Sequence, residues 1–143
     1  MTYLPDVNVW IALVADKHIH HPLAMSWFQS VPNDEFAFCR ITELGLLRLL
    51  TNVHVMGTDV KDLAGAWKLY DDIRSDSRVL LLSERGTFND RWNLAKKQMV
   101  GGANALTDAY LAVFAEHAGA SIVTFDQGFP PLLGTSVVFL TTP

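Results

Sequence analysis

A chain of 143 residues, half of them hydrophobic and 18% charged, fits one globular domain over residues 1–143. Its net charge of −4 argues against binding nucleic acid by bulk electrostatics, so any such contact would have to be local or bridged by a metal ion. We find no apolar run of membrane-spanning length, no leader pattern and a single cysteine, Cys39, so we expect a cytoplasmic protein without an internal disulfide.

Along the chain, apolar runs of strand length alternate with longer stretches in which apolar residues recur at helical spacing. Strands are predicted at residues 2–5, 35–39, 79–82, 121–125 and 137–140. Helices are predicted at residues 8–15, 22–29, 41–50, 59–74, 84–98 and about 104–118, with a loop over residues 51–58. This alternation predicts an α/β fold, a three-layer domain with a central parallel sheet and helices on both faces.

Short polar residues mark the expected helix starts in the second half of the chain. Ser83 is expected to cap the helix over residues 84–98, and either Asn104 or Thr107 to cap the next one. Gly119 is expected to end that last helix by adopting a left-handed conformation. The apolar stripe of the last helix is expected to consist of Leu106, Ala109, Tyr110 and Val113.

Four of the fifteen acidic residues differ from the others, which fall on polar helix faces or in loops. Asp6 and Asp126 directly follow apolar strands. Glu43 lies in the first turn of a helix that follows a strand, and Asp108 lies near a helix start among apolar residues. Taken singly, each of the four also fits a helix cap or a turn former.

The predicted topology brings Asp6, Glu43 and Asp126 to the carboxyl edge of one sheet. Two carboxylates about 5 Å apart repel each other by about 3 kcal/mol at an effective dielectric of 20, so such a cluster requires protonation or a cation. Oxygen ligands without histidine or thiolate favour Mg²⁺ or Mn²⁺, and a carboxylate-held Mg²⁺ points to phosphate chemistry. Asp108 is expected to be separated from Asp126, because we take antiparallel packing of helix and strand to hold them apart unless the helix is tilted.

Four short motifs, in this order, resemble those of the PIN-domain nucleases. They are Asp6-Val7-Asn8 after the first strand, Thr42-Glu43 in the third helix, Thr107-Asp108-Ala109 near a late helix start, and 124–129 (Thr-Phe-Asp-Gln-Gly-Phe). The resemblance covers essentially the whole chain. Length and spacing are most similar to the VapC-type toxins of bacterial toxin–antitoxin pairs.

The resemblance implies an Mg²⁺-dependent endoribonuclease that cleaves RNA phosphodiesters with metal-activated water and is neutralised by a cognate antitoxin. It implies that Asp108 joins the other carboxylates, with Asp6 and Asp108 as direct metal ligands and Asp126 close by. Glu43 would bind the metal directly or through water, which completes the catalytic set Asp6, Glu43, Asp108 and Asp126. Asn8 and Thr124 would hold these carboxylates in place.

Several other features allow more than one interpretation. Arg40 is placed to contact a substrate phosphate, or to pair with an acidic residue while the site is empty. His18, His20 and His21 fit a surface loop better than a zinc site. The four tryptophans fit core or interface packing, and the remaining apolar helix faces suggest a homodimer surface or a groove for the antitoxin.

The sequence also allows two alternative functions. A receiver-like domain that accepts a phosphoryl group also places carboxylates at strand ends, but it needs adjacent acidic residues after the first strand and a lysine late in the chain. This chain has Asp6-Val7-Asn8, and no lysine follows Lys97. A non-catalytic binding module with purely structural carboxylates is the second alternative, and metal-dependent RNA cleavage would distinguish it from a nuclease.

Overall fold

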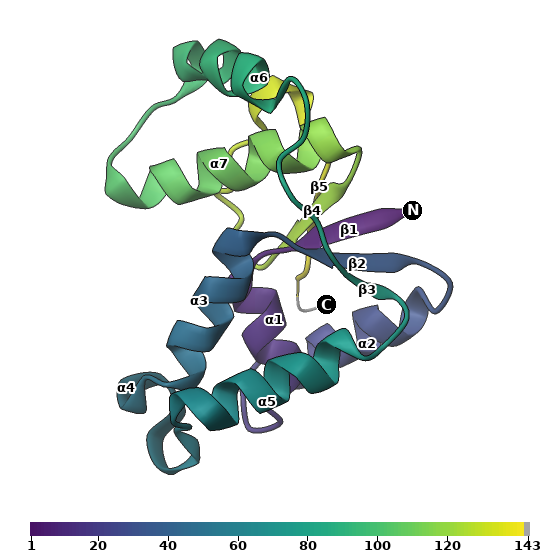
Figure 1. The fold of residues 1–143 in the computed structure, drawn as a ribbon, viewed down its shortest axis with the longest axis vertical. Helices are drawn as coiled ribbons and strands as arrows, with labels where there is room; N and C mark the ends of the chain where they lie inside the picture. The colour runs from purple at the N-terminus through teal and green to yellow at the C-terminus, as the bar shows by residue number, and fades with distance from the viewer. Residues whose placement is uncertain (142–143) are drawn as a thin grey trace.

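The strands form one parallel sheet in the computed structural model, which describes residues 1–141 (Figure 1). The sheet has five strands in the order β3-β2-β1-β4-β5. The strands are β1 (Thr2–Pro5), β2 (Glu35–Phe38), β3 (Val79–Leu81), β4 (Ser121–Thr124) and β5 (Val137–Phe139). Every pairing between neighbouring strands is parallel, so all five strands end at the same edge of the sheet, as the sequence predicted.

Helices cover both faces of this sheet (Figure 1). The α-helices are α1 (Val7–Val14), α2 (His21–Ser30), α3 (Arg40–Leu50), α4 (Val53–Met56), α5 (Leu63–Arg74), α6 (Phe88–Ala95) and α7 (Ala103–Ala118). Short 3-10 turns are η1 (Gly57–Asp59), η2 (Lys96–Gln98) and η3 (Leu132–Gly134). No helix in the described part of the chain is both long and apolar enough to cross a membrane.

Two hydrophobic cores lie on opposite faces of the sheet because successive strand residues point to opposite sides. One core contains α6 and α7 and includes the strand residues Leu4, Ala37 and Ile122. The other contains α1, α2, α3 and α5 and includes the strand residues Tyr3, Phe36, Phe38 and Val123. Strands buried on both faces explain why their sequences are continuously apolar rather than alternating.

Several predicted helix starts and one predicted loop were wrong. A glycine conformation or a capping side chain explains most of these differences. The helix predicted from residue 84 begins at Phe88, because Gly86 adopts a left-handed φ of 47° that a helix cannot contain. The helix predicted from residue 59 begins at Leu63, since the Asp62 side chain caps it by accepting from the Gly65 amide at 2.8 Å. The predicted loop over 51–58 contains α4, which Asn52 caps.

The last helix also begins earlier than predicted. α7 starts at Ala103 with Gly102 as its N-cap residue, so Asn104 and Thr107 lie inside the helix and cap nothing. Leu106 is 57% exposed and does not belong to the buried stripe, which contains Ala109 and Val113. Gly119 ends the helix in the left-handed conformation that was predicted, with φ of 69°.

Candidate functional site

Asp6 connects the central strand β1 to the helix α1. Its Oδ1 accepts a hydrogen bond from the Val7 amide at 2.7 Å, so the carboxylate caps α1. A helix cap was one of the roles that the sequence allowed for this aspartate. Its Oδ2 remains directed away from that cap and accepts from the Thr124 hydroxyl at 3.1 Å. The two oxygens of Asp6 are therefore oriented by two different elements of the fold.

Thr124, the last residue of β4, is fully buried and links three parts of the site. Its Oγ1 donates to Asp6, and the same oxygen accepts from the Asp126 amide at 3.1 Å and from Nδ2 of Asn8 at 3.4 Å. β4 is paired with β1 in the sheet, which brings Thr124 beside Asp6. Thr124 thus contacts Asp6 and Asp126 directly, whereas Asn8 contacts Thr124 and, among the described residues, hydrogen-bonds to no carboxylate.

Asp108 lies in the second turn of α7, and Asp126 follows the end of β4. The expectation that antiparallel packing would separate them was wrong. α7 reverses direction through Gly119 into β4, so the start of the helix and the end of the strand lie at the same edge of the sheet (Figure 1). Antiparallel packing is therefore what brings Asp108 to the carboxyl edge.

The three aspartates interact electrostatically. Burial raises the pKa of Asp108 to about 6, and the neighbouring charges of Asp6 and Asp126 contribute to the same rise. Burial also raises the pKa of Asp6, and Asp126 adds to this, while the hydrogen bonds from Val7 and Thr124 oppose it. Mutual repulsion among partly desolvated carboxylates is the condition under which a bound cation becomes favourable.

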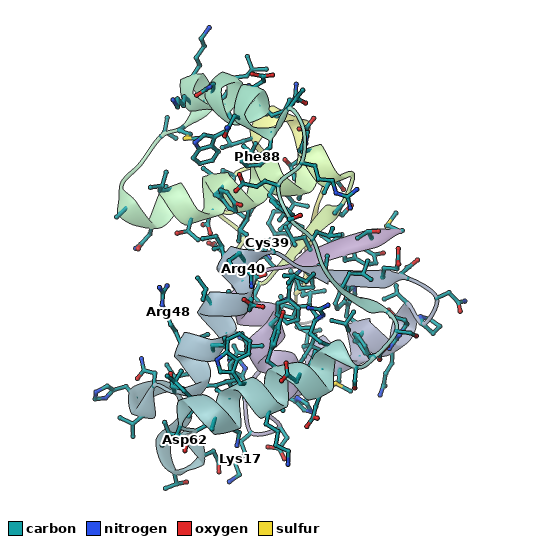
Figure 2. The ribbon with its side chains drawn as sticks, viewed as in Figure 1. Lys17, Cys39, Arg40, Arg48, Asp62 and Phe88 are labelled. Carbon is teal, nitrogen blue, oxygen red and sulfur yellow. The ribbon has the colours of Figure 1, made fainter. Side chains whose placement is uncertain are left out.

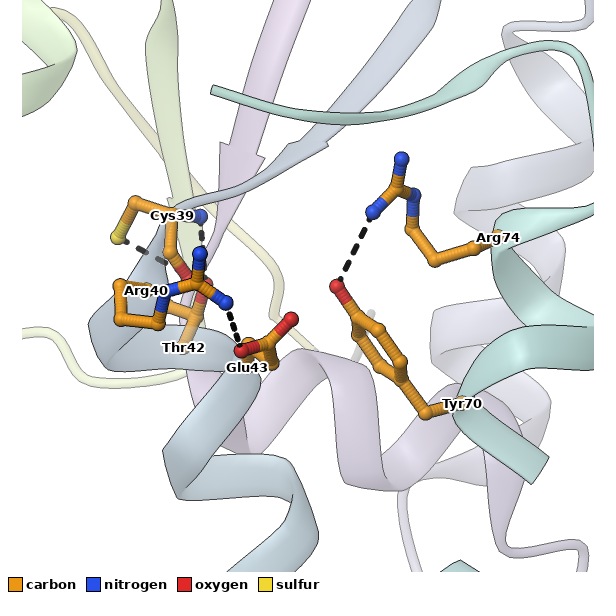
Figure 3. A network of polar contacts seen from close by, with 6 residues as sticks. All are labelled: Cys39, Arg40, Thr42, Glu43, Tyr70 and Arg74. Atoms are coloured by element: carbon orange, nitrogen blue, oxygen red, sulfur yellow. Dashed lines mark hydrogen bonds and ion pairs between the residues drawn. The ribbon is translucent and has the colours of Figure 1, made fainter. Parts of the chain in front are cut away.

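Glu43 is nearly fully buried, with 3% of its side chain exposed, in the first turn of α3. Its Oε1 accepts from Nη1 of Arg40 at 2.5 Å, and Arg40 is 65% exposed (Figure 3). Of the two roles considered for Arg40, pairing with an acidic residue is therefore the one seen in this structure. Figure 2 shows Arg40 at the end of α3 nearest to the sheet and Arg48 farther along the same helix.

Two residues at Glu43 were missed by the sequence analysis. The hydroxyl of Tyr70 points toward the Glu43 carboxylate and accepts from Nη1 of Arg74 at 3.3 Å (Figure 3). The signal that could have identified Tyr70 is chemical, since a buried tyrosine hydroxyl needs a hydrogen-bond partner.

The residues at the carboxyl edge suit a hard divalent cation, although they do not form a complete cage. Within residues 1–141, no three side chains of histidine, cysteine, aspartate and glutamate are close enough to form a ready metal site. Mg²⁺ is commonly held by one or two carboxylates, with water and substrate phosphate oxygens completing its shell. Oδ1 of Asn8 is buried without a hydrogen-bond partner in the described structure, so it could accept from a water bound to such an ion.

The cysteine, histidine and tryptophan side chains make packing or hydrogen-bond contacts within the fold. Cys39 is buried, and burial raises the pKa of its thiol, as expected for a small hydrophobic residue. The ring of His20 stacks on Phe125 with centroids 4.8 Å apart, and Nδ1 of His21 lies 2.7 Å from the Ala12 carbonyl oxygen. Of the four tryptophans, Trp10 is almost fully buried, whereas Trp67 is 41% exposed.

Comparison with known proteins identifies relatives along nearly the whole chain. Residues 3–131 match the family described as PIN domain. Ribonuclease VapC41 of Mycobacterium tuberculosis is 33% identical over 131 residues, which cover 88% of this chain and 90% of that protein. Ribonuclease VapC29 of the same species is 31% identical over 144 residues, which cover 99% of this chain and 98% of that protein.

Solved structures show the same fold at low sequence identity. VapBC2 from Rickettsia felis, bound to a DNA fragment from its promoter, includes a chain with a TM-score of 0.74 at 14% identity, covering 99% of this chain and 100% of that one. VapC20 of Mycobacterium tuberculosis, described as a sarcin-ricin loop cleaving toxin, has a TM-score of 0.59 at 15% identity, covering 90% and 92%.

Proposed function

Because the chain belongs to the PIN-domain family, we propose that it is a ribonuclease toxin, a divalent-metal-dependent endoribonuclease that a cognate antitoxin holds inactive. Curated relatives named as ribonucleases support the activity, since they match nearly full length at 31–33% identity. The similarity to a chain of a VapBC complex supports the antitoxin as partner. The protein would meet both RNA and antitoxin in the cytoplasm.

The observation that carries this proposal is the convergence of Asp6, Asp108 and Asp126, from three segments far apart in the sequence, at one edge of the sheet. Burial raises the pKa of Asp108 to about 6, and the charges of Asp6 and Asp126 add to this rise. Concentrating negative charge in a partly buried cluster costs stability, and a non-catalytic module would have no use for it. Hydrolysis of a phosphodiester, in contrast, requires a cation beside both the attacking water and the phosphate.

We assign the ion to Asp6, Asp108 and Asp126, with Mg²⁺ as the expected species and Mn²⁺ as a substitute. When bound, the ion would lower the pKa of a water molecule and neutralise charge on the phosphoryl group. Thr124 would hold one oxygen of Asp6 in position, and the hydrogen bond from Val7 would hold the other. Glu43 would complete the acidic set at the side of the site next to α3.

RNA would approach through a cleft beside this edge. A cleft of about 480 Å³ is lined by residues that include Arg40, Ser83, Glu84 and Tyr110. Arg40 is the basic residue in this lining, and its guanidinium is exposed enough to contact a phosphate of the strand. Because the net charge is −4, a few local contacts and the metal ion must replace the broad basic surface of a typical RNA-binding protein.

Cleavage assays with single-atom changes test the proposal. Asp6→Asn and Asp108→Asn replace a carboxylate oxygen by an amide and are expected to abolish RNA cleavage in Mg²⁺ and growth arrest on expression. Asp90→Asn, at an exposed position on α6, is the matched control and should cleave RNA like the parent. If the purified chain binds RNA or antitoxin but cleaves no RNA in Mg²⁺ or Mn²⁺, the non-catalytic alternative replaces the proposal.

The oligomeric state and the antitoxin surface are part of the same proposal. We propose a homodimer, supported by apolar side chains on helices that remain exposed in the single chain, among them Leu44, Leu63 and Trp67. Sedimentation of the purified chain alone and with its antitoxin tests both partners. A strictly monomeric chain would refute the homodimer and leave the nuclease proposal intact.

A further inference from the structure

Glu43 is a buried carboxylate whose one observed ion-pair partner is weakly anchored. Arg40 pairs with Oε1 of Glu43, yet its own side chain is 65% exposed. An exposed guanidinium exchanges readily between partners and is well placed to engage an incoming phosphate. If Arg40 left, Glu43 would need another donor, because a buried charge without a partner is strongly unfavourable.

Tyr70 lies on the opposite side of Glu43 from this solvent-exposed arginine. Its side chain is 2% exposed, and its hydroxyl points toward the Glu43 carboxylate (Figure 3). Its ring packs edge-on against Phe38 and Trp67, with centroids 5.0 Å and 5.6 Å away. The position of the hydroxyl is therefore fixed by packing and does not depend on substrate.

Arg74 determines how the Tyr70 hydroxyl can be used. Nη1 of Arg74 donates to the Tyr70 oxygen at 3.3 Å, which occupies the acceptor side of the hydroxyl. The single hydroxyl proton is then available for another acceptor, and the Glu43 carboxylate is the group that it faces. Donation by a cation also polarises the O–H bond and strengthens the hydrogen bond that it gives.

The ionisation of Tyr70 agrees with this arrangement. Burial raises the pKa of Tyr70 to about 12, Arg74 opposes the rise, and the Glu43 carboxylate adds to it. The hydroxyl is therefore protonated throughout the neutral range and remains a donor there.

We propose that Tyr70, backed by Arg74, is a positioning residue that holds the Glu43 carboxylate from the buried side of the site, so that Arg40 can leave Glu43 for a phosphate of the RNA. This inference rests on the proposed nuclease function. The two arginines near Glu43 then have different roles. Arg74 supports the site permanently through Tyr70, and Arg40 changes partner when substrate enters.

Steady-state cleavage of an RNA oligonucleotide in Mg²⁺ tests this with Tyr70→Phe, which removes the hydroxyl and keeps the ring. We expect kcat to fall roughly tenfold with KM within about twofold of the parent, since a hydrogen bond to a charged group is lost without loss of a substrate contact. Arg74→Met should change the same parameter in the same direction. Tyr3→Phe, which removes a hydroxyl from another buried tyrosine on β1, is the matched control and should leave kcat unchanged.

A double-mutant cycle separates positioning from a general effect on the fold. In a Glu43→Gln background, adding Tyr70→Phe should lower kcat by less than about twofold, because the residue that Tyr70 positions is already altered. An equal loss in both backgrounds, or a parental kcat for Tyr70→Phe, would overturn the inference. If Tyr70→Phe unfolds, the same cycle with Arg74→Met decides the question. Cleavage by Asp108→Asn would refute the proposed function itself, whereas an inactive Asp108→Asn with a fully active Tyr70→Phe would refute only the role of Tyr70.

Discussion

The hydroxyl of Thr124 donates to the carboxylate of Asp6 at 3.1 Å across a separation of 118 residues along the chain. This contact joins the ends of β1 and β4, the two strands at whose edge the aspartates gather. The same hydroxyl oxygen accepts from the Asp126 amide, so one buried side chain positions two of the three aspartates. The geometry of the acidic cluster therefore depends on a neutral residue.

Replacing Thr124 by valine is expected to lower kcat for RNA cleavage roughly tenfold, because Asp6 and Asp126 lose the hydroxyl that orients them while the volume is kept. Thr135→Val is the matched control. Its hydroxyl is also buried, but it donates to the carbonyl oxygens of Ala112 and Leu132. That variant should lose stability without a specific loss of kcat, and equal kcat values for the two variants would argue against the positioning role of Thr124.

The metal-free protein is expected to become less stable as the pH rises through about 6. The pKa of Asp108 is raised from 3.8 to about 6, mainly by burial, so the folded state binds this proton more tightly than the unfolded state. The stability linked to that proton is present below pH 4 and is lost by pH 7. The loss should be roughly 1 kcal/mol, less than the full shift implies, because solvent partly screens Asp108.

Urea unfolding in a chelator between pH 4 and pH 8 measures this effect. Asp108→Asn should remove most of the fall and be more stable than the parent above pH 7. Asp90→Asn, at an exposed position, should retain the parental pH dependence. A parental protein whose stability does not change between pH 4 and pH 7 would contradict the pKa assigned to Asp108.

Mg²⁺ is expected to raise the melting temperature of the parent near pH 7.5, and to raise it less at pH 5. The ion binds the folded state only, and protons compete for the same carboxylate oxygens. Because the pKa values of both Asp6 and Asp108 are raised, this competition should begin at a higher pH than for ordinary aspartates. A thermal shift in Mg²⁺ that is equal at the two pH values would place the ion elsewhere.

Removing the Arg40 side chain is expected to weaken substrate binding. Arg40→Ala should raise KM roughly threefold to tenfold and lower the salt dependence of binding, since one phosphate contact is lost. Arg48→Ala, which removes an arginine farther along α3, is the matched control and should leave KM within twofold. If both variants behave alike, the role of Arg40 is general charge and not a defined contact.

The parallel sheet and its carboxyl edge could be predicted from the sequence. Strands buried on both faces appear as continuous apolar runs, and turn residues separate one run from the next. Asp6 and Asp126 could be placed at the edge for the same reason, since each follows such a run. Asp108 required the resemblance to PIN-domain nucleases, because antiparallel packing of a helix against its following strand was wrongly taken to separate Asp108 from Asp126. With the geometry corrected, the short connection through Gly119 is enough to place Asp108 near Asp126.

Helix starts and tertiary contacts were harder to predict from the sequence. The sequence could not reveal that Gly86 would take a left-handed φ and delay α6, or that Gly102 would precede α7 in place of a polar cap. It also could not reveal the environment of Glu43, because Tyr70 and Arg74 come from α5 and meet Glu43 only through the packing of α3 against that helix. Local patterns predict an element, whereas the partner of a buried charge is a long-range property.

Asp6, Asp108 and Asp126 are expected to share one divalent-cation site, and calorimetric titration of Mn²⁺ into the metal-free protein near neutral pH measures binding at that site. We expect saturable binding by the parent and by Asp90→Asn, and loss of that binding in Asp6→Asn and Asp108→Asn while both variants remain folded. Binding of Mn²⁺ to folded Asp108→Asn with the affinity of the parent would contradict this expectation.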